Sequence, residues 1–111
     1  MAMATGELLA DMVDVIVRNV DPERIYLFGS YARGEANENS DVDLLIVQRE
    51  KPGESLDTYR EEVRLWELLA QFGVLKDILV CGSADFEYRR TGRNNVIARA
   101  VREGRVLYGR A

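Results

Sequence analysis

Two short apolar runs separated by a polar connection constrain the fold of this 111-residue chain most strongly. Residues 25–28 are apolar or aromatic and end at Gly29, and residues 42–48 are almost wholly apolar apart from Asp43. Short runs of this kind between polar turn residues are typical of buried strands. The connection over residues 29–40 is small, polar and rich in Gly, Asn and Glu, which predicts a tight turn followed by a loop.

Helical patterns alternate with these strands. Residues 8–19 place apolar side chains on one helical face, with Thr5 as the N-cap, and Asp21-Pro22 stops the pattern. A longer helix is predicted over residues 56–72, capped by Ser55 and ended by Gly73. Its expected core stripe consists of Leu56, Tyr59, Val63, Trp66, Leu69 and Ala70, widened by Leu65, Leu68 and Phe72.

A third strand and a helical tail follow. The strand covers residues 74–80 and contains Lys76, whose charge predicts an exposed strand end or edge. The tail is expected to be helical over residues 84–103, with a break near Thr91-Gly92, and extended over residues 104–108. This order predicts the α/β class, with a small mixed β-sheet flanked by helices in a single domain over residues 1–111.

The amino-acid composition excludes several classes of protein and of catalytic mechanism. The chain is 47% hydrophobic and 31% charged, as is usual for globular proteins, and it has neither a run of about 18 apolar residues nor a signal-peptide layout. We therefore expect a soluble, unprocessed cytoplasmic protein with no membrane contact. The absence of histidine excludes Ser-His, Cys-His and His-metal mechanisms, and a lone Cys81 forms neither an internal disulfide nor a zinc site.

The net charge of −4 is unevenly distributed. Residues 1–85 carry 17 acidic and 8 basic side chains, whereas residues 86–111 carry 2 and 7. The basic segment is either a solvated helix or a contact surface for an acidic partner or phosphates, and the acidic remainder argues against duplex nucleic acid. The candidate docking residues, expected to lie outside the chemical site, are Arg89, Arg90, Arg93, Arg99, Arg102 and Arg105, and the tail extends to Arg110.

Two aspartates stand at the start of the second strand. Asp41 and Asp43 are two positions apart, so their carboxylates project to the same side. Like charges so close repel each other unless a cation offsets them, and oxygen ligands favour a hard ion such as Mg²⁺. Taken alone, the pair is more often a turn-capping feature than a metal site.

The glycine turn before them suits phosphate. Gly29 follows a buried strand directly, and Ser30 would open a short helix through Arg33. Backbone N–H groups at such a helix start and the Ser30 hydroxyl can hold phosphate oxygens, while Arg33 offsets negative charge or pairs with Glu35. No Walker A sequence and no dinucleotide fingerprint is present.

The combined pattern, Gly-Ser-Tyr-Ala-Arg-Gly-Glu at 29–35 and Ser-Asp-Val-Asp-Leu at 40–44, resembles minimal nucleotidyltransferase (MNT) domains of the DNA polymerase beta-like superfamily. The resemblance implies that Gly29, Ser30 and Arg33 bind the phosphates of ATP. It also implies that Asp41 and Asp43 bind Mg²⁺ with a third carboxylate from a later strand, for which Asp77 is the candidate. Lys76 departs from the family pattern beside it.

The resemblance also implies a partner. MNT proteins are commonly paired with HEPN-domain toxins, which suggests an antitoxin that transfers AMP from ATP to a tyrosine hydroxyl of the toxin. Two alternatives remain open at this point. One is a binding-only antitoxin with a vestigial site, and the other is a small-molecule nucleotidyltransferase that completes its acceptor pocket as a homodimer.

Overall fold

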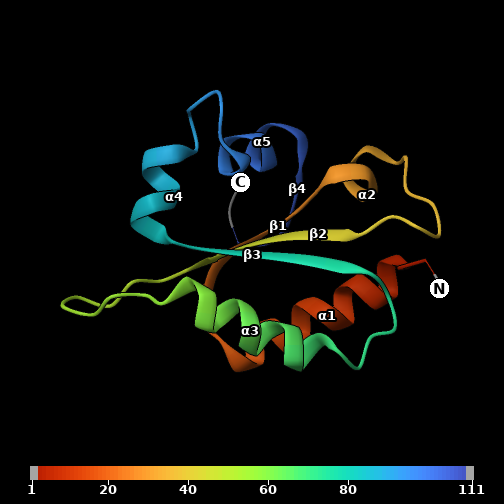
Figure 1. The fold of residues 1–111 in the computed structure, drawn as a ribbon, viewed down its shortest axis with the longest axis horizontal. Helices are drawn as coiled ribbons and strands as arrows, with labels where there is room; N and C mark the ends of the chain where they lie inside the picture. Colours follow the sequence, from red (N-terminus) through yellow and green to blue (C-terminus); the bar gives the residue numbers. More distant parts are fainter. Residues whose placement is uncertain (1–2, 110–111) are drawn as a thin grey trace.

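A computed structural model describes residues 3–109 and shows a four-stranded sheet with helices on both faces (Figure 1). The strand order is β3-β2-β1-β4, with β2 and β3 parallel and the other pairs antiparallel. This mixed sheet confirms the predicted fold class. The elements are α1 (Gly6–Asn19), β1 (Pro22–Phe28), α2 (Gly29–Arg33), β2 (Val42–Gln48), α3 (Thr58–Leu69), β3 (Lys76–Gly82), α4 (Ser83–Arg89), α5 (Val96–Glu103) and β4 (Arg105–Tyr108).

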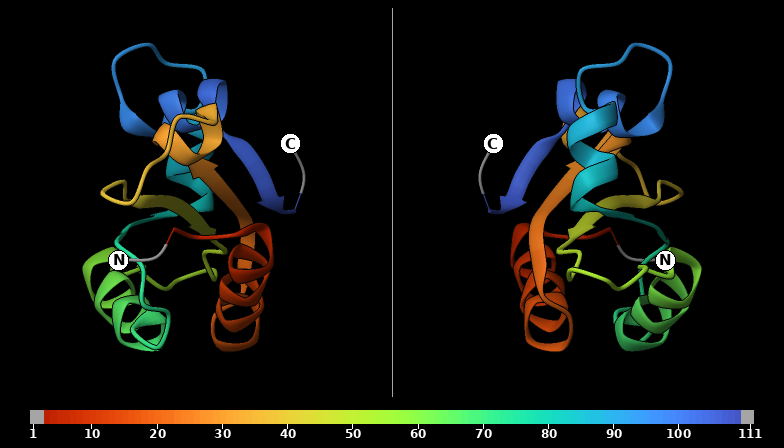
Figure 2. Two further views of the ribbon diagram at one scale, coloured as in Figure 1. Left: turned by 90° about the vertical axis from the view of Figure 1, so that its right-hand side faces the viewer. Right: turned by 90° about the vertical axis from the view of Figure 1, so that its left-hand side faces the viewer.

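The two faces of the sheet carry separate apolar clusters. Helices α1 and α3 cover one face, and α2, α4 and α5 lie over the other (Figures 1 and 2). Side chains of β2 alternate between them, so that Leu44 and Ile46 join the cluster under α1 and α3, while Leu45 and Val47 join the second. Because β2 is buried on both faces, its sequence is apolar at nearly every position.

Helix α1 forms as predicted. The Thr5 side chain accepts a hydrogen bond from the Leu8 N–H at 3.1 Å and so caps the first turn. Met12 and Ile16, one turn apart, are fully buried against the sheet. The chain then enters β1 at Pro22, where the missing N–H at the first strand position costs no ladder hydrogen bond.

Helix α3 differs from its prediction in both cap and orientation. Asp57, not Ser55, accepts the capping hydrogen bond, from the Arg60 N–H at 3.1 Å. The helix ends at Leu69 with Ala70 in the right-handed region, so Gly73 plays no capping role. Leu65 and Leu69 face the core, whereas four members of the expected core stripe are exposed: Tyr59 by 73%, Val63 by 40%, Trp66 by 45%, and Ala70.

The physical reason is that α3 has two apolar stripes. Leu65, Leu68 and Leu69 form one, and the Tyr59–Trp66 row lies on another side of the helix. Helical periodicity does not decide between them. Packing on β3 selects the leucines, and the Glu62 carboxylate of α3 accepts a hydrogen bond from the Val80 N–H on the outer edge of β3 at 2.9 Å.

The third strand and the helical tail refine other expectations. β3 is an edge strand, as predicted, but Lys76 is only 9% exposed rather than solvated, and burial lowers the pKa of its ammonium group. The tail breaks between α4 and α5 near the predicted position. Among residues 3–109, no helix is long and apolar enough to cross a membrane.

Candidate active site

The glycine turn joins β1 directly to α2. Gly29 has a φ of +72°, which favours glycine, and the five-residue helix ends at Gly34 with a φ of +74°. A Cβ atom on Gly29 would collide with the Asp43 carboxylate. The turn therefore needs glycine for two independent reasons, its backbone conformation and the side chain that lies against it.

The structure brings the predicted acids to the same end of the sheet. Asp43 is the register partner of Phe28 on β1 and of Asp77 on β3. Since paired strands lie about 4.8 Å apart, Asp43 and Asp77 are neighbours across the parallel pair. Asp41 immediately precedes β2, where the Val42 N–H donates to the Leu75 carbonyl at 2.8 Å and extends the ladder. Asp41 and Asp77 are exposed, whereas Asp43 is half-buried beside Gly29.

The electrostatics of Asp43 reflect this crowding. Burial first, and then repulsion from Asp77 and Asp41, raise the pKa of the Asp43 carboxyl to about 6. The guanidinium groups of Arg33 and Arg99 act in the opposite direction. Asp43 thus carries an uncompensated cost of ionisation that a bound cation would remove.

The donor set fits a hard cation such as Mg²⁺, which takes carboxylate oxygens. Asp41, Asp43 and Asp77 supply such oxygens at one end of the sheet, and their mutual repulsion favours a cation among them. As they stand, no three acidic or cysteine side chains within residues 3–109 are gathered tightly enough to hold a metal ion. A shared ion therefore requires these exposed carboxylates to turn toward Asp43.

Arg99 is a candidate site residue that the sequence interpretation missed. Helix α5 packs against α2 and β1, and its C-cap Gly104 sits so close to β1 that an added Cβ would lie 2.6 Å from the Leu27 carbonyl oxygen. This packing brings the Arg99 charge within influence of Asp43, although Arg99 itself lies on α5, outside the glycine turn and the aspartate strand, as expected. No periodicity signal could have found it, because the approach depends on helix packing.

The remaining predicted residues have local partners. Arg33 pairs with Glu35 at 3.1 Å, as expected, and the Ser40 hydroxyl braces the loop by accepting from the Asn37 N–H at 2.9 Å. Cys81 is buried, and burial raises the pKa of its thiol to about 12, which agrees with a packing role rather than a nucleophile.

The basic tail is largely engaged with its own acids. Arg89 pairs with Asp85 at 2.7 Å, and Arg99 pairs with Glu103 at 3.1 Å. Arg102 donates to the Gly92 carbonyl at 2.9 Å. Arg110 lies outside the described residues. Docking of an acidic partner on this segment stays a prediction.

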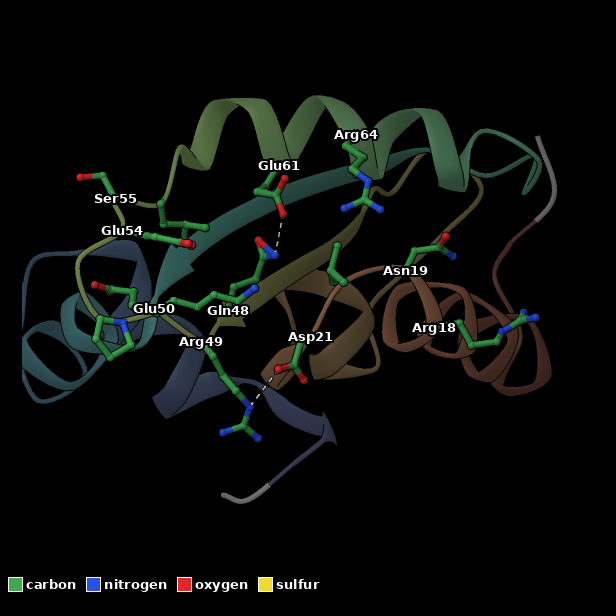
Figure 3. Close-up of a pocket in the computed structure, with 14 residues that line it drawn as sticks. Arg18, Asn19, Asp21, Gln48, Arg49, Glu50, Glu54, Ser55, Glu61 and Arg64 are labelled. Carbon is green, nitrogen blue, oxygen red and sulfur yellow. Dashed lines mark hydrogen bonds and ion pairs between the residues drawn. The ribbon is translucent and has the colours of Figure 1, made fainter.

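A cavity of about 620 Å³ lies at the opposite end of β2 (Figure 3). It is lined by the end of α1, by Gln48 and by the loop that leads to α3. Its charges are mixed, and the Arg49 guanidinium lies 3.5 Å from the Asp21 carboxylate. It contains neither the glycine turn nor the crowded acids.

Comparison with known proteins agrees with the motif. Residues 9–106 match the family model of the nucleotidyltransferase domain. The chain is 35% identical over 75 residues to "Putative protein adenylyltransferase MJ0141" of Methanocaldococcus jannaschii, covering 68% of each chain. It is 34% identical over 86 residues to the similarly named MJ0604 of the same organism, covering 78% of each.

Solved structures share the fold. A toxin–antitoxin complex with AMP-PNP contains a chain that matches with a TM-score of 0.64 at 22% identity, over 91% of this chain and 73% of that one. A complex of tri-AMPylated Shewanella oneidensis HEPN toxin with MNT antitoxin gives 0.61 at 19%, over 96% and 74%. Since the family model spans nearly the whole chain, this protein belongs to the nucleotidyltransferase domain family.

Proposed function

We propose that this protein is a Mg²⁺-dependent adenylyltransferase that moves AMP from ATP to a tyrosine hydroxyl of a HEPN-domain toxin in the cytoplasm, and so acts as its antitoxin. The observation that carries the proposal is the contact of Asp43 with the Gly29 turn, opposite Asp77 on the next strand. It unites a phosphate-binding turn with oxygen ligands for a cation. The names of the relatives, with AMP-PNP and a HEPN toxin among the structural neighbours, support the substrate and the partner.

Different residues of the chain would bind the phosphates of ATP and the Mg²⁺ ion. The N–H groups at the start of α2 have no partner within the helix and, with the Ser30 hydroxyl, would donate to phosphate oxygens of ATP. Arg33 and Arg99 would add positive charge beside them. Asp41, Asp43 and Asp77 would hold Mg²⁺, which when bound neutralises charge on the phosphates.

The transfer itself needs no protein nucleophile. The acceptor oxygen forms a bond to the α-phosphorus, and the bond from that phosphorus to the bridging oxygen of pyrophosphate breaks. The hydroxyl proton passes to the exposed Asp77 carboxylate and from there to water. Positioning and charge stabilisation dominate catalysis of this kind, which suits a chain without histidine.

Transfer from ATP labelled on the α-phosphate tests the proposal. The purified chain, Mg²⁺ and a HEPN-domain toxin should yield label on a toxin tyrosine, and a toxin variant with that tyrosine changed to Phe should stay unlabelled. Toxin neutralisation without label would identify the binding-only antitoxin instead. Label on a small-molecule hydroxyl, dependent on a dimer of this chain, would identify the third alternative.

A further inference from the structure

Helix α3 carries a continuous apolar row on its outer side. The row consists of Tyr59, Val63, Trp66 and Ala70, all of them exposed, and is called the α3 seam below. The inner side of the helix packs through its buried leucines on β3, with α1 beside it (Figures 1 and 2). Single exposed apolar residues are ordinary, but a contiguous row of them is typical of an interaction surface.

The spacing of the α3 seam is that of a coiled coil. Its members follow one another at intervals of four, three and four residues, which are the a and d positions of a heptad repeat. Helix α3 has twelve residues, too few for a stable coiled coil of isolated helices. Here the helix is already held by its packing on the sheet, so a second helix could dock on it without having to order it first.

The largest member of the seam is held in place before any partner binds. The Lys76 ammonium nitrogen lies 5.4 Å from the centroid of the Trp66 ring, and Lys76 itself is only 9% exposed. A side chain that is ordered in advance loses little conformational freedom on binding. Tryptophan and tyrosine are also the residue types that contribute most to many protein interfaces.

The charges beside the seam indicate which helix fits it. Arg60 and Glu67 occupy the flanking e positions, both are exposed, and neither forms an ion pair within residues 3–109. In an antiparallel pair of α3 helices, Val63 of each copy lies against Trp66 of the other. Arg60 of each copy then lies beside Glu67 of the other, where the charges attract. A parallel pair would set Glu62 beside Glu67 of the other copy, where they repel.

We propose that the α3 seam is a homodimer interface, on which a second copy of this chain docks its own α3 in the antiparallel direction about a twofold axis. The axis repeats every contact, so two Arg60–Glu67 pairs flank one apolar centre. Asp43 shares its side of β2 with Leu45, on the face of the sheet away from α3, so both candidate active sites stay open. The dimer does not depend on the proposed function.

Sedimentation equilibrium of the purified chain at increasing concentration tests the proposal. The wild type should show a reversible monomer–dimer equilibrium, and Val63→Glu should weaken it at least about tenfold, because a charge would enter the centre of the interface. Val96→Glu is the matched control and should dimerise like the wild type. Val96 is 44% exposed against 40% for Val63, but it lies on α5, over the other face of the sheet (Figure 1). A wild type that stays monomeric, or a Val63→Glu variant that dimerises normally, would overturn the interface.

Exchange of the flanking charges tests the antiparallel direction. Arg60→Glu and Glu67→Arg should each weaken dimerisation about tenfold at low salt, because two attractive pairs become repulsive. The double variant restores opposite charges and should regain the wild-type dissociation constant within about twofold. An equimolar mixture of the two single variants should associate more tightly than either variant alone. A double variant no tighter than the single ones would contradict the antiparallel pairing.

Binding to a HEPN-domain toxin distinguishes the second copy from another occupant of the seam. Val63→Glu should bind the toxin as the wild type does, although it no longer dimerises. Both valines are exposed, so neither substitution should lower the melting temperature appreciably. A monomeric wild type whose binding to the toxin is lost in Val63→Glu and kept in Val96→Glu would assign the seam to the toxin and refute the homodimer.

Discussion

The two ends of β2 differ in how the charged side chains around them are balanced. At its start, Asp43 lies against Gly29 with Asp41 and Asp77 nearby, and their repulsion contributes to a raised pKa of the Asp43 carboxyl. At its end, the Gln48 amide donates to the Glu61 carboxylate at 2.8 Å, and the neighbouring cavity holds side chains of both signs (Figure 3).

The difference teaches that unbalanced charge, and not cavity volume, distinguishes the candidate site from the rest of the strand. The far end holds a cavity of about 620 Å³, yet its charges pair with one another. The acidic end keeps carboxylates in a costly arrangement, which persists in a fold only where the surroundings enforce it. Matched substitutions at the two ends should therefore change activity and stability to different extents.

The largest expected effect is loss of transfer in Asp43→Asn. Removing this carboxylate takes away a cation ligand and several kcal/mol of charge stabilisation, so the transfer rate should fall at least about a hundredfold. Gln48→Met at the far end should transfer AMP at the wild-type rate. The rates are measured with α-labelled ATP and the toxin. Near-normal transfer by Asp43→Asn would show that the acidic end of β2 is no more important for AMP transfer than the far end.

The second effect is on the unfolding free energy of two glycine variants, and it separates the cost of a side-chain collision from the cost of backbone strain. Gly29 and Gly53 both have positive φ, but a Cβ meets Asp43 at Gly29 and open space at Gly53, in the far-end loop. Gly53→Ala should cost about 1 kcal/mol of unfolding free energy from strain alone. Gly29→Ala should cost about 2–3 kcal/mol, because the collision adds to the strain. Urea unfolding measures both, and equal losses would show that the turn tolerates a side chain.

The third effect is a pH dependence confined to the acidic end. The folded-state pKa of Asp43, about 6, exceeds its ordinary value of 3.8, so the folded chain binds this proton more tightly than the unfolded chain does. The metal-free protein should therefore lose stability as the pH rises from about 4 to about 6. Melting temperatures in EDTA measure the trend, and Asp43→Asn should flatten it. A wild-type profile that parallels Asp43→Asn over this range would contradict the raised pKa.

The fourth effect compares two arginines. Arg99 lowers the pKa of Asp43, whereas Arg64 lines the far cavity on the opposite side of the sheet. Arg99→Gln should weaken ATP binding about two- to fivefold, the range for an exposed charge, and Arg64→Gln should leave it unchanged. Calorimetry with a non-hydrolysable ATP analogue measures the affinity of both variants. Equal affinities for the ATP analogue in the two variants would show that Arg99 is a solvated residue of α5 with no role in ATP binding.

The smallest effect concerns the stability of the far end itself. Gln48 is 5% exposed, and its Oε1 atom has no hydrogen-bond partner among residues 3–109. Gln48→Met would lose the bond to Glu61 but also remove an unsatisfied oxygen, so the unfolding free energy should change by less than about 1 kcal/mol. A loss above about 3 kcal/mol would mean that this polar contact organises the far end.

Much of the fold was predictable because its signals are local. Thr5 caps α1 and residues 42–48 form a strand over their full predicted length, as local sequence indicates. The short helix begins at Gly29, one residue before the predicted start at Ser30. The candidate site follows largely from the same signals, since strand alternation already placed the aspartates on one side. That Asp43 pairs in register with Asp77 depended on a long-range parallel pairing that the motif only implied.

Sequence by itself determined which residues are apolar and where the chain turns, and it predicted chemistry that relies on carboxylates and a glycine turn. These properties depend on neighbours within a few positions, where backbone geometry and side-chain periodicity act directly. Tertiary structure alone decided that Leu65 rather than Trp66 faces the core, that Lys76 is buried, and that Arg99 approaches Asp43. In each case several orientations satisfy the local pattern equally well, and the free energy of packing one element against another selects among them.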